Sequence, residues 1–395
     1  MKMLSLLGAL AGCALAVAAA AAAATAAAAP RARDLGVPFD GNPGPLNAIT
    51  DVAGVTVGHT TLISGEGKLR VGEGPVRTGV TAVLPRGQAS LSVPVFAGWY
   101  SLNGNGEMTG TTWVEESGFL EGPVMITNTH SVGVVRDAVI RWRVQHGGAD
   151  TTGYWWSLPV VAETWDGWLN DVNGFHVKPE HAIHALETAH GGAVEEGNVG
   201  GGTGMICNGF KGGIGSASRR VAQKEGSFML GVLVQCNYGR RQNLRIAGVA
   251  VGREIAAPEP YTFVPSELAE RGSIIVVVAT DAPLLPTQLK RLARRVPLGL
   301  GRDGSVSGNG SGDIFIAFST ANEQAGSSEG IREVRMLPND SLDELFAATV
   351  NATEEAVVNA MVAARDMTGA DNHRVIALPH ERLREVLRKY NRLTQ

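Results

Sequence analysis

The residue with the most distinctive chemical context in this sequence is Ser273, which follows Gly272 and opens an unbroken apolar run. If the peptide bond between them were cut, Ser273 would carry both a hydroxyl and a free α-amine. Such an amine has a pKa of roughly 7.7–8.0 and can act as a general base for the hydroxyl. Glycine suits self-cleavage, because it can adopt the distorted backbone that an N-to-O acyl shift requires. A Gly-Ser pair also opens ordinary strands, so local chemistry leaves both interpretations open.

Three further polar residues could assist a serine nucleophile. Ser311 and Asp313 lie two apart in a glycine-rich segment and could present a hydroxyl and a carboxylate to one cavity, although such segments are usually turns. Asn237 ends an apolar segment, and its amide could donate a hydrogen bond to an oxyanion. An asparagine that merely terminates a strand fits equally well.

Two other motifs indicate binding chemistry more weakly. Residues 200–204 resemble a dinucleotide-binding loop, but no βαβ unit with a downstream acidic residue surrounds them. His181, His184, Glu187 and His190 recur at intervals of three on one expected helix, where they could bind zinc. The His-Glu-x-x-His pattern is absent, and a solvated helix face explains these residues more simply.

The elements that must position these residues are a mixture of strands and helices. Because they do not alternate regularly, the pattern favours a layered α+β fold over a doubly wound sheet. Proline and charged residues between 253 and 272 predict a solvated linker that runs directly into a buried strand. Expected strands cover residues 52–57, 79–84, 91–96, 123–128, 158–163, 228–235, 274–279 and 314–319, and expected helices cover residues 131–145, 179–190, 286–296, 341–367 and 380–390.

The composition narrows the class of protein. The 395 residues carry 34 Lys and Arg against 38 Asp and Glu, a formal charge of −4, which argues against a nucleic-acid-binding surface. Hydrophobic residues make up 44% and charged residues 18%, so the chain can bury a large core and wholesale disorder is excluded. The 51 glycines predict many tight turns and close backbone approaches.

The N-terminal residues predict export. Residues 1–29 combine Lys2, an apolar run and an alanine tract, the pattern of a signal peptide, so the mature protein is expected to be periplasmic or secreted. Cys13 ends a short lipobox-like sequence and is a possible lipid anchor. No later segment offers the ~20 apolar residues of a membrane span. Cys207 and Cys236 lie in apolar surroundings and are expected to be buried free thiols, with a disulfide permitted but not indicated.

Taken together, five segments resemble one family. They are residues 51–59, 163–167, 200–213, 237–239 and 272–284, in that order along the chain. The sequence resembles the DmpA group of self-processing serine peptidases, which includes the L-aminopeptidase/D-esterase-amidases and the β-aminopeptidases. The similarity extends over nearly all of the chain that follows the signal peptide.

The resemblance implies self-cleavage between Gly272 and Ser273. Residues 30–272 would form a large subunit and residues 273–395 a small one, both parts of one catalytic domain. Ser273 would be the nucleophile, with Ser311 and Asp313 as its supporting serine and acid. Asn237 would supply the oxyanion hole.

The resemblance also implies how substrates bind and how the chain folds. Glu163 matches the carboxylate that binds a substrate's ammonium group. Trp165 stands where the family usually has a tyrosine hydroxyl, and an indole N–H can donate but cannot accept a proton. The implied fold is a four-layer αββα sandwich of the DmpA and ornithine acetyltransferase type, assembled as homotetramers or larger. No metal or cofactor is implied, and the substrates would be small peptides or amino-acid amides and esters.

Two alternative functions remain at this point. One is an acyl transferase of the ornithine acetyltransferase type, which shares the fold but usually has a threonine nucleophile. The other is an unprocessed extracytoplasmic protein that binds a small ligand with its glycine-rich loops. The sequence does not distinguish L-α-, D- and β-amino acid substrates, because pocket shape decides that choice.

Overall fold

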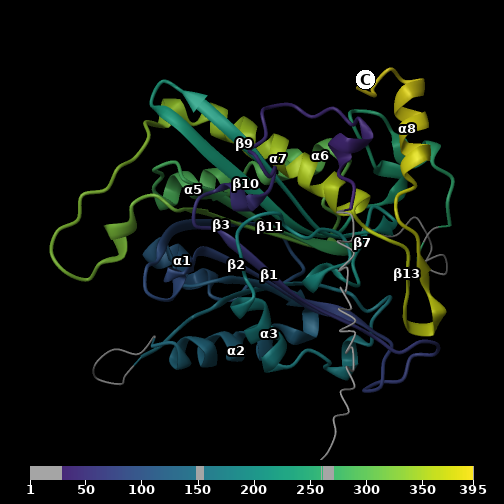
Figure 1. Cartoon of the computed structure of the whole chain (residues 1–395), viewed down its shortest axis with the longest axis horizontal. Helices are drawn as coiled ribbons and strands as arrows, with labels where there is room; N and C mark the ends of the chain where they lie inside the picture. The colour runs from purple at the N-terminus through teal and green to yellow at the C-terminus, as the bar shows by residue number, and fades with distance from the viewer. Residues whose placement is uncertain (1–28, 148–154, 259, 261–270, 395) are drawn as a thin grey trace, which may run out of the picture.

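Two stacked β-sheets form the centre of the molecule (Figure 1). The computed structural model describes residues 29–147, 155–258, 260 and 271–394. The smaller sheet has the order β1 (Thr56–Ser64), β2 (Val76–Gln88), β5 (Val124–Asn128) and β6 (Val160–Thr164). The larger sheet has the order β4 (Phe119–Leu120), β3 (Val95–Gly104), β12 (Gly310–Ser319), β11 (Arg271–Thr280), β10 (Gly226–Asn237) and β9 (Gly213–Gln223).

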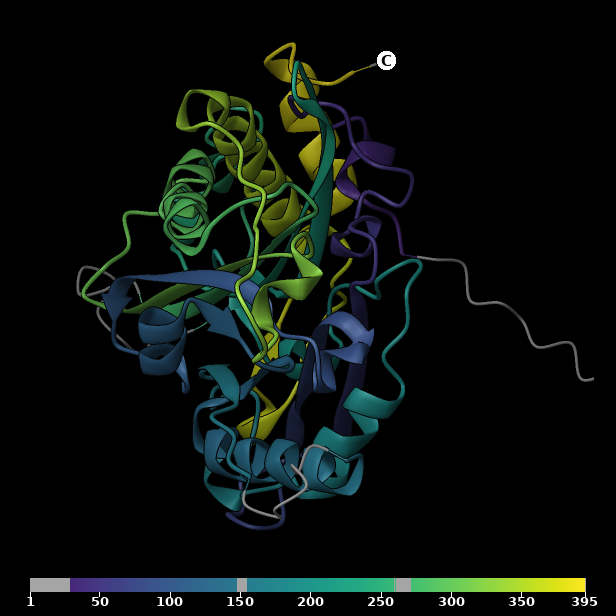
Figure 2. The same ribbon diagram turned by 90° about the vertical axis from the view of Figure 1, so that its left-hand side faces the viewer.

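Helices cover the outer face of each sheet. On the smaller sheet lie α2 (Val132–Gln145) and α3 (Pro179–Glu187), which pack on β2, β5 and β6. On the larger sheet lie α5 (Pro286–Ala293), α6 (Val296–Arg302) and α7 (Asp343–Val362). Figure 2 shows the two helical layers on opposite sides of the stacked sheets. The layers are therefore αββα, as the sequence resemblance implied, and the fold class is α+β.

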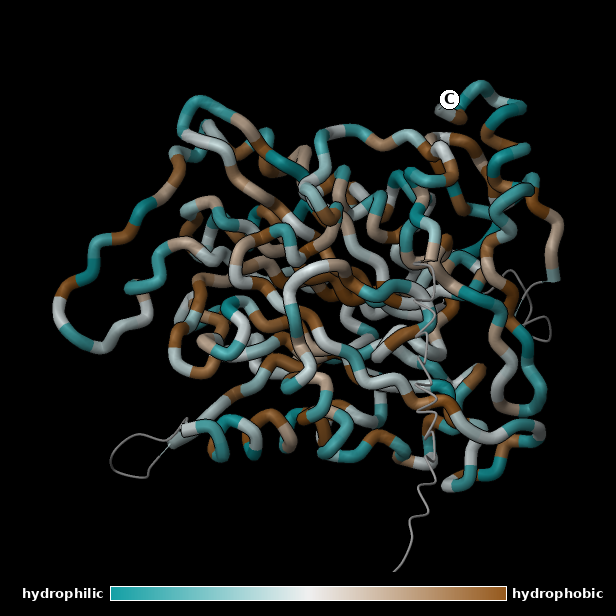
Figure 3. The backbone as a smooth tube through the Cα atoms, viewed as in Figure 1, coloured by the Kyte–Doolittle hydropathy of each residue, from teal (hydrophilic) through white to brown (hydrophobic). Residues whose placement is uncertain are grey.

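Strand β11 explains why the core forms where it does. Its apolar run has residues on both faces buried, with Ile274 and Val276 packing toward the helices and Ile275 and Val277 packing toward the smaller sheet. A strand covered on both faces must be apolar without alternation, and the run supplies this. The apolar segments in Figure 3 accordingly gather in the interior.

The pairing directions bring three strand ends to one edge of the larger sheet. Strand β10 is antiparallel to β11, and β11 is parallel to β12. The last residue of β10, Asn237, therefore lies beside the start of β11, and the start of β12 lies on the other side of β11. This edge also includes the end of β3, because Gly104 pairs with Gly312.

The remaining elements are shorter. A hairpin of β7 (Ile206–Cys207) and β8 (Phe210–Lys211) follows the glycine-rich 3-10 turn Gly200–Gly202. The others are α1 (Thr111–Ser117), α4 (Val251–Glu254), α8 (His380–Lys389), and the pair β13 (Met367–Thr368) and β14 (Arg374–Val375). Among the described residues, none of the helices has the length and apolar character needed to cross a membrane.

Several expected elements were misplaced. The strand predicted at 52–57 begins at Thr56, because a 3-10 turn and a tight bend precede it. The strand predicted at 91–96 begins at Val95 for the same kind of reason. Strand β9 was missed because glycine and serine fill it where its neighbours approach closely: a Cβ on Gly215 would lie 2.0 Å from the Ala356 carbonyl oxygen. The predicted helix 286–296 is two helices, α5 and α6.

The expectation of two free thiols is wrong. Cys207 and Cys236 form a disulfide, with their Cα atoms 5.5 Å apart. The cysteines are 29 residues apart in the chain, so the sequence carried no local sign that β7 and β10 meet. The predicted signal peptide, including Cys13, and most of the predicted linker at 253–272 lie outside the described residues.

Candidate active site

Ser273 lies at the shared strand edge between Asn237 and Gly312. In register, it is the partner of Asn237 on β10 and of Gly312 on β12. Side chains of a strand alternate between faces, so Ser273 shares the face of Ile275 and Val277, toward the smaller sheet. The serine is buried, with 4% of its surface exposed.

The Ser273 hydroxyl is held against the bond that precedes it. Its Oγ donates to the Gly272 carbonyl oxygen at 2.7 Å and accepts from the Gly312 N–H at 3.3 Å. Gly272 has φ +130°, a conformation that strains any residue with a side chain, and a Cβ there would lie 1.9 Å from the Asn237 carbonyl oxygen. Only glycine therefore fits this position without a shift of the neighbouring strand.

Ser311 and Asp313 lie within β12 and not in a loop as the sequence predicted. Residues two apart on a strand share a face, and the Ser311 Oγ donates to Asp313 Oδ1 at 2.6 Å. They flank Gly312, the partner of Ser273, and both are fully buried. Alternation places them on the helix-covered face with Phe315, opposite the face that carries the Ser273 side chain.

The Asn237 side chain has a fixed orientation. Its Oδ1 accepts from the Ile206 N–H at 2.8 Å, and its Nδ2 donates to the Trp165 carbonyl oxygen at 2.8 Å. Because a backbone N–H only donates and a carbonyl only accepts, a flipped amide would lose both bonds. The second N–H of Nδ2 remains for another acceptor, and Asn237 shares the face of Ser273 because β10 alternates in the same register.

Glu163 presents a carboxylate held by two donors. Its Oε1 accepts from the Glu107 N–H at 3.0 Å, and its Oε2 accepts from the Thr129 hydroxyl at 2.5 Å. Burial raises the pKa of Glu163, and the hydrogen bonds from Thr129 and Glu107 partly offset this shift. A buried carboxylate held by neutral donors is suited to accept an ammonium group.

Gly106 connects Glu163 to the strand edge that holds Ser273. A Cβ on Gly106 would lie 3.2 Å from Glu163 Oε1 and 3.1 Å from the Gly312 Cα. Strands β6 and β11 also lie against each other across the two sheets. The carboxylate, the serine and the Asn237 amide therefore converge on one region, although they come from three strands.

Trp165 contributes its backbone to this region. Its carbonyl accepts the hydrogen bond from Asn237, while its indole lies over Gly167, where a Cβ would be 2.6 Å from the ring. Its side chain is about two-fifths exposed. The sequence did not single out Glu107, Thr129 or Ile206, whose contacts to the predicted residues arise only from folding.

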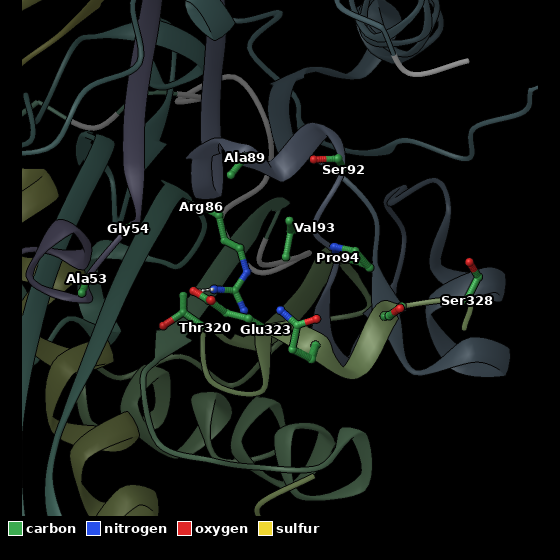
Figure 4. Close-up of a pocket in the computed structure, with 13 residues that line it drawn as sticks. Ala53, Gly54, Arg86, Ala89, Ser92, Val93, Pro94, Thr320, Glu323 and Ser328 are labelled. Atoms are coloured by element: carbon green, nitrogen blue, oxygen red, sulfur yellow. Dashed lines mark hydrogen bonds and ion pairs between the residues drawn. The ribbon is translucent and has the colours of Figure 1, made fainter. Parts of the chain in front are cut away.

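A cavity of about 790 Å³ lies elsewhere, next to Thr320 and therefore beyond the opposite end of β12 (Figure 4). Its wall includes an ion pair between Arg86 and Glu323, and none of the predicted site residues lines it. Among the described residues, no group of three or more His, Cys, Asp or Glu side chains is arranged to hold a metal ion.

Comparison with known sequences gives a consistent result. The model of peptidase family S58 matches residues 47–375. The chain is 58% identical over 376 residues to the β-peptidyl aminopeptidase BapA of Sphingosinicella microcystinivorans, with 92% of this chain and 93% of the relative covered. It is 48% identical over 368 residues to the protein of the same name from Sphingosinicella xenopeptidilytica, with 91% of each covered.

Comparison with solved structures agrees. The L-aminopeptidase D-Ala-esterase/amidase of Ochrobactrum anthropi, described as a variant of the Ntn hydrolase fold, superposes with a TM-score of 0.87 at 52% identity. The alignment covers 92% of this chain and all of that one. A β-aminopeptidase from Burkholderia sp. superposes with a TM-score of 0.82 at 46% identity, covering 91% of this chain and 99% of that one.

Proposed function

The chain belongs to peptidase family S58 and is a hydrolase of the aminopeptidase and amidase type, and from this premise we propose that it is exported, cleaves itself and uses Ser273 as its nucleophile. The observation that carries the proposal is the position of the Ser273 hydroxyl, 2.7 Å from the Gly272 carbonyl oxygen and directly opposite Asn237. A hydroxyl so placed contacts the carbonyl group that it must attack.

Self-cleavage proceeds through an ester. The Ser273 Oγ attacks the Gly272 carbonyl carbon, the C–N bond breaks, and the proton of the hydroxyl goes to the released α-amine. Water then hydrolyses the ester, which leaves a carboxylate on Gly272 and restores the hydroxyl. The positive φ of Gly272 supports this step, because glycine alone adopts this backbone conformation readily and keeps the carbonyl beside the hydroxyl.

After self-cleavage, the same catalytic groups hydrolyse substrates. The α-amine of Ser273 takes the hydroxyl proton while Oγ attacks the substrate carbonyl, and Asn237 Nδ2 donates to the oxyanion. Collapse expels the leaving amine or alcohol with that proton, and water hydrolyses the acyl-enzyme. Ser311 is the register partner of Gly272, the residue before the α-amine, and this supports a role for the Ser311–Asp313 pair in holding the charge of that amine.

Glu163 sets the requirement for a free amino group. Its buried carboxylate would bind the ammonium of the residue to be released, with Gly106 leaving space between Glu163 and Gly312. The relatives are named for β-peptidyl and L-aminopeptidase activities, which favours small peptides, amides and esters with a free amine over acyl transfer. We propose the same substrate class for this chain, acting as a homo-oligomer.

The anchoring of the N-terminal residues supports export with removal of residues 1–29. Arg31 forms an ion pair with Glu196 at 2.8 Å, and Arg33 forms one with the fully buried Glu355 at 2.7 Å. The residues immediately after the predicted cleavage site therefore have their own anchors to the rest of the fold. The intact mass of the exported protein distinguishes this cleavage from lipidation at Cys13.

The test compares wild-type protein with Ser273→Ala. Wild-type protein should give two fragments, the smaller beginning with Ser273, whereas Ser273→Ala should remain one inactive chain. Fragments of these sizes from Ser273→Ala, or an uncut wild-type chain with full activity, would refute the proposal. Incubation with acetyl-ornithine and glutamate checks for acetyl transfer, and N-acetylated amides check the need for a free amine.

A further inference from the structure

Lys211 is a fully buried lysine at the end of the β7–β8 hairpin. Its three N–H donors are all used: Nζ donates to the carbonyl oxygens of Met205 at 2.7 Å, Gly212 at 2.8 Å and Gly202 at 3.3 Å. Among the described residues, no carboxylate forms an ion pair with it. Burial lowers the pKa of Lys211 to about 7. A buried charge is costly, so its position calls for an explanation beyond packing.

One of the three carbonyls belongs to a peptide group that contacts Asn237. The Met205–Ile206 peptide points its carbonyl oxygen at Lys211 Nζ and its N–H at Asn237 Oδ1, at 2.7 and 2.8 Å. The Gly212 N–H also donates to the Met205 oxygen at 2.9 Å, and this second bond helps to fix the orientation of the peptide group. A chain of contacts therefore runs from an ammonium through two amide groups to the edge that carries Ser273.

Each link in this chain acts in the same direction. A cation at the carbonyl end of a peptide draws electron density toward the oxygen and strengthens its N–H as a donor. That N–H then polarises the Asn237 amide in the same sense, so Nδ2 becomes a better donor. The contacts also fix the orientation of the Asn237 amide. If the amide were flipped, its Oδ1 would face the Trp165 carbonyl oxygen, and two acceptors cannot form a hydrogen bond.

We propose that Lys211 is a positioning residue for the oxyanion hole, acting on Asn237 through the Met205–Ile206 peptide. This role rests on the proposed function of Asn237 and adds a residue that does not touch the substrate. It differs from a purely structural role for Lys211, in which the ammonium only holds the glycine-rich turn Gly200–Gly202 closed. The two roles predict different effects on ligands that do and do not form an oxyanion.

The experiment uses the self-cleaved enzyme and two inhibitors. An amino-acid aldehyde adds to the serine hydroxyl and places an oxygen in the oxyanion site, whereas the matching amino alcohol binds without one. Lys211→Met removes the charge and the donors at similar length. We expect kcat/KM and aldehyde affinity each to fall roughly tenfold, less than the 10²–10³ for loss of a direct donor. KM and amino alcohol affinity should change less than about twofold.

A matched control separates this effect from loosening of the loop. Thr203→Val removes a buried hydrogen bond of 2.6 Å to Gly200 in the same turn but contacts neither Met205 nor Asn237 in this network. It should leave the ratio of aldehyde to amino alcohol affinity unchanged. If Lys211→Met does not fold, Lys211→Gln, which keeps an amide donor group without charge, replaces it with the same expected pattern.

Two outcomes overturn the inference. One is an unchanged aldehyde affinity in the folded Lys211 variant, and the other is an equal loss of both inhibitors. As controls, N-terminal sequencing and substrate turnover are measured for the wild-type protein at the same time. If the wild-type chain neither cleaves itself nor hydrolyses substrate, the proposed function itself is refuted. If the wild-type protein is active and the Lys211 variant binds the aldehyde as tightly as the wild type does, only this inference is refuted.

Discussion

Asn237 and Ser273 are direct partners across the antiparallel pair β10 and β11, so the amide and the hydroxyl emerge from neighbouring strands on the same face. The amide is held by Ile206 on one side and Trp165 on the other. In the proposed reaction it would therefore meet a developing charge without first having to reorient, which is the condition for effective oxyanion stabilisation.

Two substitutions at Asn237 test this arrangement. Asn237→Ala should lower kcat roughly 10²–10³-fold with little change in KM. Asn237→Asp keeps the acceptor for the Ile206 N–H but presents a carboxylate to the oxyanion, so it should be at least as impaired. Steady-state kinetics on the cut enzyme measure both effects, and near-normal kcat in either variant would contradict the assigned role.

The backbone at Gly272 predicts that replacing this glycine slows the proposed self-cleavage. Gly272→Ala would place a Cβ 1.9 Å from the Asn237 carbonyl oxygen and would require φ near +130° in a residue with a side chain. We expect the strand edge to shift and self-cleavage to slow by at least tenfold. The time course of fragment formation measures this, with Gly301→Ala as control, because a Cβ there meets nothing within 4 Å.

The pKa of Glu163 predicts how ligand binding depends on pH. Burial raises this pKa above its ordinary value, so the carboxylate gains its proton at a higher pH than an exposed glutamate would. Affinity for an amino alcohol should therefore be full above the raised pKa and fall as the pH drops through it. Calorimetric titration across pH 4–8 measures this, and Glu163→Gln should bind weakly at every pH.

A substitution at Thr129 tests whether its hydrogen bond tunes the pKa of Glu163. Its hydroxyl donates to Glu163 Oε2 and favours the ionised carboxylate. Thr129→Val should raise the pKa of Glu163 further, so the loss of amino alcohol affinity should begin at higher pH than in the wild-type protein. An identical pH profile in the two proteins would show that this hydrogen bond does not tune the carboxylate.

The disulfide predicts a loss of stability on reduction. Cys207 and Cys236 adjoin Ile206 and Asn237, and they join segments 29 residues apart. Replacing both by Ala should lower the free energy of unfolding by ~2–4 kcal/mol, because the unfolded chain regains freedom. Denaturant unfolding measures this, and a mass 2 Da lower than that of the dithiol form verifies the bond. Unchanged stability would mean that the bond adds little.

The sequence predicted which residues gather in one region better than it predicted the contacts that they make. Ser273, Asn237 and Glu163 lie in long motifs, so their convergence on one region could be expected. Lys211 could not be assigned a role, because its partners are backbone carbonyls whose approach depends on the fold of a glycine-rich turn. Trp165 aligns with a tyrosine of the family, yet its contact to Asn237 is made by a backbone carbonyl that every residue type possesses.

The strand boundaries were mispredicted for a related reason. Ser311 and Asp313 appeared to lie in a loop because glycines surround them, but pairing with β11 extends the strand back to Gly310. Glycine-rich segments become strands where close neighbours leave no space for side chains, as a Cβ on Gly312 would lie 2.5 Å from the Asn105 carbonyl oxygen. Such neighbours are far apart in the chain and leave no local trace.

The strand order of the larger sheet has a consequence for assembly of the two proposed fragments. The strands that would belong to the shorter fragment, β11 and β12, lie between β10 on one side and β3 on the other, which would belong to the longer fragment. The shorter polypeptide would therefore supply the two central strands of a sheet whose outer strands belong to the longer one. They should copurify without any covalent link, and synthesis of each half from its own gene should yield aggregates rather than a reconstituted heterodimer.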